Sequence, residues 1–176
     1  MPKSEKLEEA CLVAKDIVDL FRLFAEGAEL NTTPIGKAMA VGLKVKYNWY
    51  QIGEADFLYA FFSTIAYNLE NKNWGSRFPA IMDDLYQGKV DYCNIDAAEK
   101  QLLAIKEELK GIPANKIVWD IDDVSKSPPW GTNISSDIKN LSNYFLTSDG
   151  EDMFETFFRA IDAAKSLKAN LEIKKL

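Results

Sequence analysis

Two hydrophobic patterns of different period meet between residues 41 and 70. Apolar side chains first alternate with glycine or lysine, at Val41, Leu43, Val45 and Tyr47. A period of two is that of a strand with one buried face, and residues 49–52 are predicted to return as a second strand. Residues 54–70 then place large apolar side chains three and four residues apart, which is the spacing of a helix. The sequence therefore predicts a β-hairpin that leads into a central, buried helix.

The remaining elements mix helices and strands without a regular βαβ alternation. Helices are predicted over residues 80–87, 97–110 and 151–168. Short strands are predicted over residues 117–121, 143–147 and 171–173, and residues 122–140 are predicted to form a long polar loop. Elements in this order are typical of an α+β domain. We expect one small sheet, mixed or antiparallel, of about three to five strands, with helices packed on one face.

The first 38 residues differ from the rest of the chain. From Ser4 to Gly27, apolar side chains recur at spacings of three and four, which predicts one helix. Residues 31–36 contain a proline and a glycine and interrupt the pattern. We therefore expect an N-terminal helical extension and linker over residues 1–38 and an α+β domain over residues 39–176. The apolar face of the extension must be covered, either by the domain or by a partner such as a second copy of the chain.

Composition excludes several kinds of chemistry. The 176-residue chain contains no histidine, so Ser-His-Asp, Cys-His and histidine–metal mechanisms are excluded. Its 27 acidic and 21 basic side chains give a formal charge of −6, which repels nucleic-acid backbones. Cys11 and Cys93 form neither a disulfide framework nor a CxxC site. No apolar stretch approaches the roughly 20 residues that cross a bilayer, so we expect a cytoplasmic protein that binds neither membrane nor nucleic acid.

Motifs for nucleotide binding and for covalent catalysis are also missing. Neither glycine-rich phosphate loop, GxGxxG or GxxxxGK followed by Ser or Thr, occurs in the chain, and the nucleophile motif GxSxG does not occur. Residues 148–152 carry several side-chain oxygens, but they precede an apolar helix and are interpreted as its N-terminal cap. We therefore expect no cofactor and no enzymatic activity.

Three carboxylates, Asp120, Asp122 and Asp123, lie at the end of the strand predicted over residues 117–121. On a strand, Asp120 and Asp122 point to the same face, which permits them to share a cation such as Mg²⁺. No companion carboxylate or histidine occurs at a recognised metal-binding spacing. Three interpretations stay open: a solvated turn or helix cap, an acidic surface that meets a partner, and a metal site.

Two Trp-Gly dipeptides, Trp74-Gly75 and Trp130-Gly131, lie in polar loops. Loop tryptophans often anchor protein contacts, because they bury a large area at a small entropic cost. They also fold back and close the edge of a core. The sequence leaves both roles open for each tryptophan.

Several blocks of residues resemble, in the same order, the bacterial immunity 70 family. The resemblance covers residues 40–176, and its two Trp-Gly blocks are the most specific. The matching blocks are residues 41–45, 50–53, 56–58, 61–64, 69–71, Trp74 to Pro79, 84–88, 118–123, Pro128 to Gly131, 133–135, 141–145 and 147–150. The first 38 residues lie outside the resemblance.

The resemblance implies a small cytoplasmic protein that binds and neutralises a cognate toxin domain of a bacterial polymorphic-toxin system. The family supplies no catalytic residues, so the contact residues are predicted from the loops and the acidic group. They are Asn73, Trp74, Arg77, Asp120, Asp122, Asp123 and Trp130. Two alternatives of another class remain: a metal-dependent hydrolase that uses the three aspartates, and an oligomerisation or scaffold module that acts through the N-terminal helix.

Overall fold

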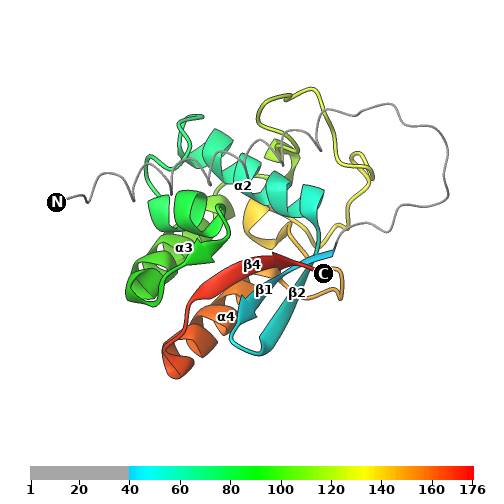
Figure 1. Cartoon of the computed structure of the whole chain (residues 1–176). Coiled ribbons are helices and arrows are strands. Elements are labelled where there is room, and N and C mark those ends of the chain that lie inside the picture. The colour runs from blue at the N-terminus through cyan, green and yellow to red at the C-terminus, as the bar shows by residue number, and fades with distance from the viewer. Residues whose placement is uncertain (1–39) are drawn as a thin grey trace, which may run out of the picture. The chain divides into compact units, whose positions relative to one another are not determined.

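Figure 1 shows a computed structural model of the chain, in which residues 40–176 are described. The helix predicted over residues 4–27, its linker and the contact with a second copy through that helix lie outside the described residues. The described part is an α+β fold, as the sequence predicts. None of its helices combines the length and the apolar character needed to cross a membrane.

The sheet has four strands and is antiparallel throughout. The strands are β1 (Ala40–Val45), β2 (Asn48–Glu54), β3 (Lys89–Val90) and β4 (Leu171–Lys175), and their order is β2-β1-β4-β3. The predicted hairpin is confirmed as β1 and β2, and the predicted last strand is confirmed as β4. Strand β3 was not predicted, because its two residues are too few to show an alternating pattern.

Alternation along β1 separates the two faces of the sheet. Leu43 and Val45 are fully buried, whereas Lys44 between them is exposed. Direct pairing places Lys44 opposite Trp49 on β2 and opposite Glu172 on β4. Because directly paired residues point to the same side of an antiparallel sheet, these three side chains lie on the face away from the core.

The helices lie close to their predicted positions. They are α2 (Ala55–Leu69), the π-helix η1 (Ala80–Leu85), α3 (Ile95–Lys110) and α4 (Met153–Leu167). Three short 3-10 turns accompany them, η2 (Tyr92–Asn94), η3 (Ala114–Lys116) and η4 (Leu141–Asn143). The predicted capping segment before α4 is confirmed at its last residue, because the Asp152 side chain accepts a hydrogen bond from the backbone N–H of Glu155 (3.1 Å).

Helix α2 is the centre of the core. Both α2 and α4 pack against β1 and β2, and α4 is seen alongside the strands in Figure 1. The buried ring of Phe61 on α2 joins these layers through close contacts with four other phenylalanine rings. Its centroid lies 5.2–5.5 Å from those of Phe62, Phe145, Phe154 and Phe157.

The strand predicted over residues 117–121 is wrong. The segment bends at Trp119 and Ile121, and none of the four strands of the sheet pairs with it. Side chains of α2 take the place of a strand: the hydroxyl of Thr64 both accepts from the N–H and donates to the carbonyl of Val118, at 3.1 Å each. A pattern of apolar residues cannot distinguish this arrangement from a strand, because apolar side chains are buried in this segment as they are in a strand.

The strand predicted over residues 143–147 is also wrong. The 3-10 turn η4 occupies its first residue, and the side chains of Asn140 and Asn143 form a reciprocal capping box around that turn. Leu146 makes a single isolated bridge with Asp152. Phe145 still points into the core, so the apolar spacing reports burial here and not strand pairing.

The side chain of Trp49 and the backbone of Tyr50 lie so close to Gly42 that a larger residue there is predicted to destabilise the fold. The indole of Trp49 lies directly over this glycine, and a Cβ atom at Gly42 would lie 2.4 Å from that ring and 2.6 Å from the carbonyl oxygen of Tyr50. We expect Gly42→Ala to lower the free energy of unfolding by about 1–3 kcal/mol, because the backbone oxygen cannot move aside without breaking the hairpin.

Urea denaturation of the purified chain measures this effect. Gly111→Ala is the matched control, since its Cβ would lie 3.5 Å from the nearest atom, the carbonyl oxygen of Glu108, at an ordinary contact distance. Equal stabilities of the two variants would contradict the prediction.

Candidate functional site

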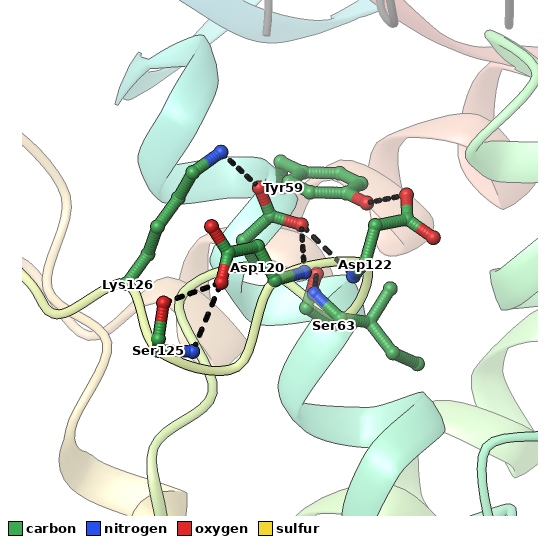
Figure 2. Close-up of polar contacts among 8 residues, drawn as sticks. Tyr59, Ser63, Asp120, Asp122, Ser125 and Lys126 are labelled. Atoms are coloured by element: carbon green, nitrogen blue, oxygen red, sulfur yellow. Dashed lines mark hydrogen bonds and ion pairs between the residues drawn. The ribbon is translucent and has the colours of Figure 1, made fainter. Parts of the chain in front are cut away.

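A polar stripe along α2 fixes the segment that carries the predicted acidic group. Four side chains of the helix bind four successive parts of this segment, and Figure 2 shows two of them, Ser63 and Tyr59, at the acidic turn. The pairs are Asn68 with the carbonyl of Lys116 (3.1 Å), Thr64 with Val118, Ser63 with the N–H of Ile121 (3.3 Å), and Tyr59 with Asp122 (3.2 Å). The acidic turn is thereby anchored against the N-terminal half of α2.

Asp120 shapes the acidic turn from within. Its side chain is only 7% exposed, and its Oδ1 accepts hydrogen bonds from the backbone N–H groups of Asp122 (2.9 Å) and Asp123 (3.3 Å). Its Oδ2 binds the ammonium group of Lys126 at 2.7 Å, and this hydrogen bond raises the pKa of the lysine. Asp120 is therefore a residue that folds the turn, and most of its hydrogen-bonding capacity is already used.

Asp122 and Asp123 present their carboxylates to solvent. Asp122 accepts a hydrogen bond from the hydroxyl of Tyr59, whose pKa is raised, first by burial and then by the charge of Asp122. Asp123 accepts from both the N–H (3.2 Å) and the hydroxyl (2.5 Å) of Ser125, which lowers the pKa of the aspartate. Asp123 therefore stays charged at neutral pH, and hydrogen bonds hold both carboxylates in fixed positions.

The three aspartates do not converge on one point. The strand that would align Asp120 with Asp122 is not formed, and each carboxylate has its own hydrogen-bond donors. Within residues 40–176, no group of three or more aspartate, glutamate, cysteine or histidine side chains has the arrangement of a metal site. The geometry therefore favours the interpretation of this group as a turn with an acidic outer surface.

Trp74 is fixed against the side of α2. Its indole N–H donates to the carbonyl of Met82 (2.6 Å), and its ring stacks on Tyr59 with the centroids 6.5 Å apart. Tyr86 (4.7 Å) and Phe62 (6.2 Å) enclose the same ring from other sides. Half-buried in this cluster, Trp74 closes the edge of the core and keeps one edge at the surface beside Tyr59.

A buried carboxylate holds the loop that carries Trp74. Glu70 is 2% exposed and accepts hydrogen bonds from the backbone N–H groups of Gly75 (2.8 Å), Arg77 (2.9 Å) and Phe78 (3.0 Å). These bonds replace the water that the carboxylate loses on burial. The position of the loop is thus set by the last turn of α2.

Arg77 is directed toward the protein itself. Its guanidinium donates to the carbonyl of Leu69 (2.8 Å) and to both carboxylate oxygens of Glu108 (2.9 and 2.7 Å), and this pairing lowers the pKa of Glu108. Arg77 and the exposed Asn73 lie near the C-terminal end of α2, whereas the acidic turn lies at its N-terminal half. The predicted contact residues therefore do not form one group.

Trp130 is the more exposed of the two loop tryptophans. It is 41% exposed, and its indole N–H donates to the hydroxyl of Tyr144 (3.0 Å). Its ring meets Phe57 and Trp119 edge-on, with centroids 5.7 and 5.5 Å away. Because Trp119 directly precedes Asp120, this contact brings Trp130 beside the acidic turn.

These residues are linked by contacts and by the chain, and we call them the α2 surface. Trp74 stacks on Tyr59, Tyr59 donates to Asp122, and Trp130 contacts Trp119, which precedes the acidic turn. Its members are Tyr59, Trp74, Trp119, Asp122, Asp123 and Trp130. The structure thus links four of the seven predicted contact residues, with the buried Asp120 folding the turn; Asn73 is exposed next to Trp74, and Arg77 is directed toward Glu108.

The sequence analysis missed Tyr59 and placed Trp119 in a strand. A signal for Tyr59 was present, because Asp56, Tyr59 and Ser63 recur at helical spacing and form a polar stripe on a helix whose other sides are apolar. Tyr59 and Trp119 connect the predicted residues to each other. The arrangement combines aromatic area with two fixed negative charges, which is suited to binding a protein surface that carries basic groups.

The chain was compared with known proteins. A family model described as Immunity protein 70 matches residues 43–173. No curated protein and no solved structure gives a match. The matched range contains all seven predicted contact residues and the whole α2 surface.

Thr64→Val tests the polar stripe. The change keeps the shape of the side chain but leaves the buried N–H and carbonyl of Val118 without their partner. We expect the free energy of unfolding to fall by about 2–3 kcal/mol, since each unsatisfied buried group costs about 1–3 kcal/mol. Thermal and urea denaturation measure the loss.

Thr156→Val is the matched control for this change. The hydroxyl of Thr156 donates to the carbonyl of Asp152, which also accepts the backbone N–H of the same residue (3.1 Å each), and it accepts from the exposed guanidinium of Arg159 (3.2 Å), which can turn to water when the hydroxyl is removed. We expect a smaller loss there, and a larger loss in Thr156→Val than in Thr64→Val would contradict the prediction.

Asp83 gives a prediction for pH dependence. Its carboxylate lies against Gly75, and burial, together with the charge of Glu70, raises the pKa of Asp83 above its ordinary value. The folded chain therefore binds this proton more tightly than the unfolded chain, and the ionised form destabilises the fold at neutral pH. Asp83→Asn is expected to raise the melting temperature at neutral pH, and the gain should disappear below the ordinary aspartate pKa of about 3.9.

Thermal melts across a pH series measure this gain. Asp162→Asn, on an exposed position of α4, is the control and should raise the melting temperature less. A gain of Asp83→Asn that persists in acid would show that the ionised carboxylate is not the cause.

Proposed function

The chain belongs to the immunity protein 70 family, and from this premise we propose that it neutralises a cognate bacterial toxin domain by binding it in a stoichiometric complex. The toxin-binding region in this proposal is the α2 surface. Family membership supports the class of partner. The geometry of the α2 surface supports the place of contact.

The observation that carries the proposal is the fixed contact of Asp122 with Tyr59, on whose ring Trp74 stacks. Each aromatic ring is held by a hydrogen bond or by neighbouring rings, so little side-chain entropy is lost when a partner covers it. Tryptophan and tyrosine are the residues that most often contribute strongly to protein interfaces. A surface prepared in this way favours tight binding without rearrangement of the chain.

Charge supports a basic partner. Asp122 and Asp123 lie at the surface with their charges outward, and the whole chain has a formal charge of −6. Opposite charges accelerate the association of two proteins, and the effect decreases as salt screens it. A toxin domain that acts on nucleic acid carries a basic groove, and the acidic turn would occupy that groove in place of phosphate.

The proposal does not require catalysis by this chain. The α2 surface offers aromatic rings and carboxylates that are already bound to donors, and its tyrosine hydroxyl is engaged with Asp122. We therefore propose a non-enzymatic protein of the bacterial cytoplasm that acts by covering its partner.

Co-expression with candidate toxin domains, taken first from genes next to the one for this chain, tests the function. We expect the chain to restore growth of cells that produce the toxin, and to elute with it in size-exclusion chromatography as a complex of fixed stoichiometry. Failure of both measurements would remove the proposed function.

Trp130→Ala tests the surface. We expect it to weaken toxin binding by about tenfold or more, because an exposed, pre-positioned tryptophan is the kind of residue that dominates an interface. Leu103→Ala is the matched control, since Leu103 is also a large exposed side chain (49%) but lies on α3. Isothermal titration calorimetry measures both affinities, and thermal melts verify that both variants are folded.

The acidic turn is tested by association rates. Asp122→Lys and Asp162→Lys change the net charge equally, but only the first lies on the α2 surface. We expect Asp122→Lys to slow association at low salt by about tenfold and to flatten its salt dependence, whereas Asp162→Lys changes it little. Stopped-flow fluorescence over a salt series measures the rates, and equal effects of the two changes would place the contact elsewhere.

A further inference from the structure

The sheet has a second face, on the side away from the core that α2 and α4 form with β1 and β2 in residues 40–176. Register along β1 places its members on one side: Gly42 pairs with Gln51 and Lys174, Lys44 pairs with Trp49 and Glu172, and Lys89 pairs with Glu172. We call this side the open face. It contains Gly42, Lys44, Trp49, Gln51, Lys89, Glu172 and Lys174. Its lysines are exposed, whereas Leu43 and Val45 on the opposite side are fully buried.

Trp49 forms a fixed aromatic platform on the open face. Its ring lies over the bare backbone of Gly42, and its indole N–H donates to the side-chain oxygen of Gln51 (2.9 Å). The ring is thus held flat against the sheet from below and along one edge. Trp49 is half-buried and also lines a groove, and because its ring is already held, ordering it on binding costs little entropy.

A shallow groove lies beside this platform. It has a volume of about 280 Å³ and is lined by the apolar side chains of Tyr47, Trp49 and Leu176 and by the lysines Lys44 and Lys174. Tyr47, at the tip of the hairpin, is 98% exposed. An apolar floor with a cationic rim is the lining expected for a segment that carries both apolar and acidic side chains.

Charge on the open face is opposite to that of the chain. Lys44 and the neighbouring Lys46 in the hairpin turn make no ion pair with any residue from 40 to 176, and Lys174 has only a long contact with Glu172 (3.6 Å). Lys89 is paired with Asp91 at 2.9 Å. A formal charge of −6 overall therefore hides a cationic patch on the sheet.

We propose that the open face is a second docking surface, which binds a short acidic segment of a partner protein. Carboxylates of the segment pair with Lys44 and Lys174, and an apolar side chain between them packs on Trp49 and Tyr47. A nucleic acid is disfavoured, because the net charge of the chain repels a long polyanion whereas a short segment of few charges meets only the local patch. The α2 surface and the open face share no residue, so the two docking surfaces are independent.

Nuclear magnetic resonance of the full chain tests the proposal directly. The probe is a short peptide in which glutamate alternates with leucine. The same peptide with lysine in place of glutamate and a short oligothymidylate serve as comparison ligands. Trp49→Phe assigns the indole N–H signal of Trp49 among those of the four tryptophans. We expect the glutamate peptide to shift this signal in a saturable way.

Two pairs of variants make the test specific. Lys44→Gln with Lys174→Gln removes the cationic rim, and Lys100→Gln with Lys139→Gln removes two exposed lysines elsewhere. We expect the first pair to weaken binding by about threefold to tenfold, as two partly exposed ion pairs would, and the second pair to leave it unchanged. Tyr47→Ser should also weaken binding, because it removes the apolar wall without touching the core.

The outcomes separate cleanly. Loss of binding in the open-face variants alone supports the proposal. Equal binding by all variants, preferential binding of the lysine peptide or of oligothymidylate, or absence of binding by the glutamate peptide would overturn it. None of these measurements uses the toxin domain, so their outcome is distinct from the success or failure of the proposed function.

Discussion

The hydrogen bonds of Thr64 to the backbone of Val118 are the interaction on which the arrangement of the surface depends. They satisfy both backbone polar groups of the buried residue Val118 without a partner strand, and a buried backbone group requires a hydrogen-bond partner. Helix α2 can therefore serve two purposes at once. Its apolar sides, centred on Phe61, hold the layers together, while its polar stripe fixes the acidic turn on the outside.

Burial of single carboxylates gives this protein its surface geometry. Glu70 and Asp120 are each almost fully buried, and each folds a loop by accepting backbone N–H groups. In both loops, these internal bonds position neighbouring side chains: Trp74 against α2 in one, Asp122 and Asp123 toward solvent in the other. An acidic composition thus does not by itself indicate an acidic surface, because part of the charge is used to fold the loops.

Sequence periodicity predicted correctly the elements whose backbone hydrogen bonds are made within a helix or between paired strands. The alternation at Leu43 and Val45, and the helical spacing through Phe61, each report one buried face, and both predictions are confirmed. The two wrong strands, at Val118 and at Phe145, show the same burial but obtain their backbone hydrogen bonds from distant side chains or from a capped turn. Periodicity carries no information on the source of those bonds.

The predicted contact residues fall into those that face solvent and those that are bound within the fold, and the sequence pattern does not separate the two. Trp130 and Asp122 were predicted as contact residues because aromatic rings and charges in loops are typical of protein interfaces, whereas Tyr59 was hidden within an apolar helix. Arg77 has the composition of a contact residue, yet its guanidinium is held by Leu69 and Glu108 within the fold. A bidentate partner inside the protein must be broken before the arginine can bind outside it, and that cost makes Arg77 a weaker candidate for an interface than Asp122, which can accept a further donor while it keeps its bond to Tyr59.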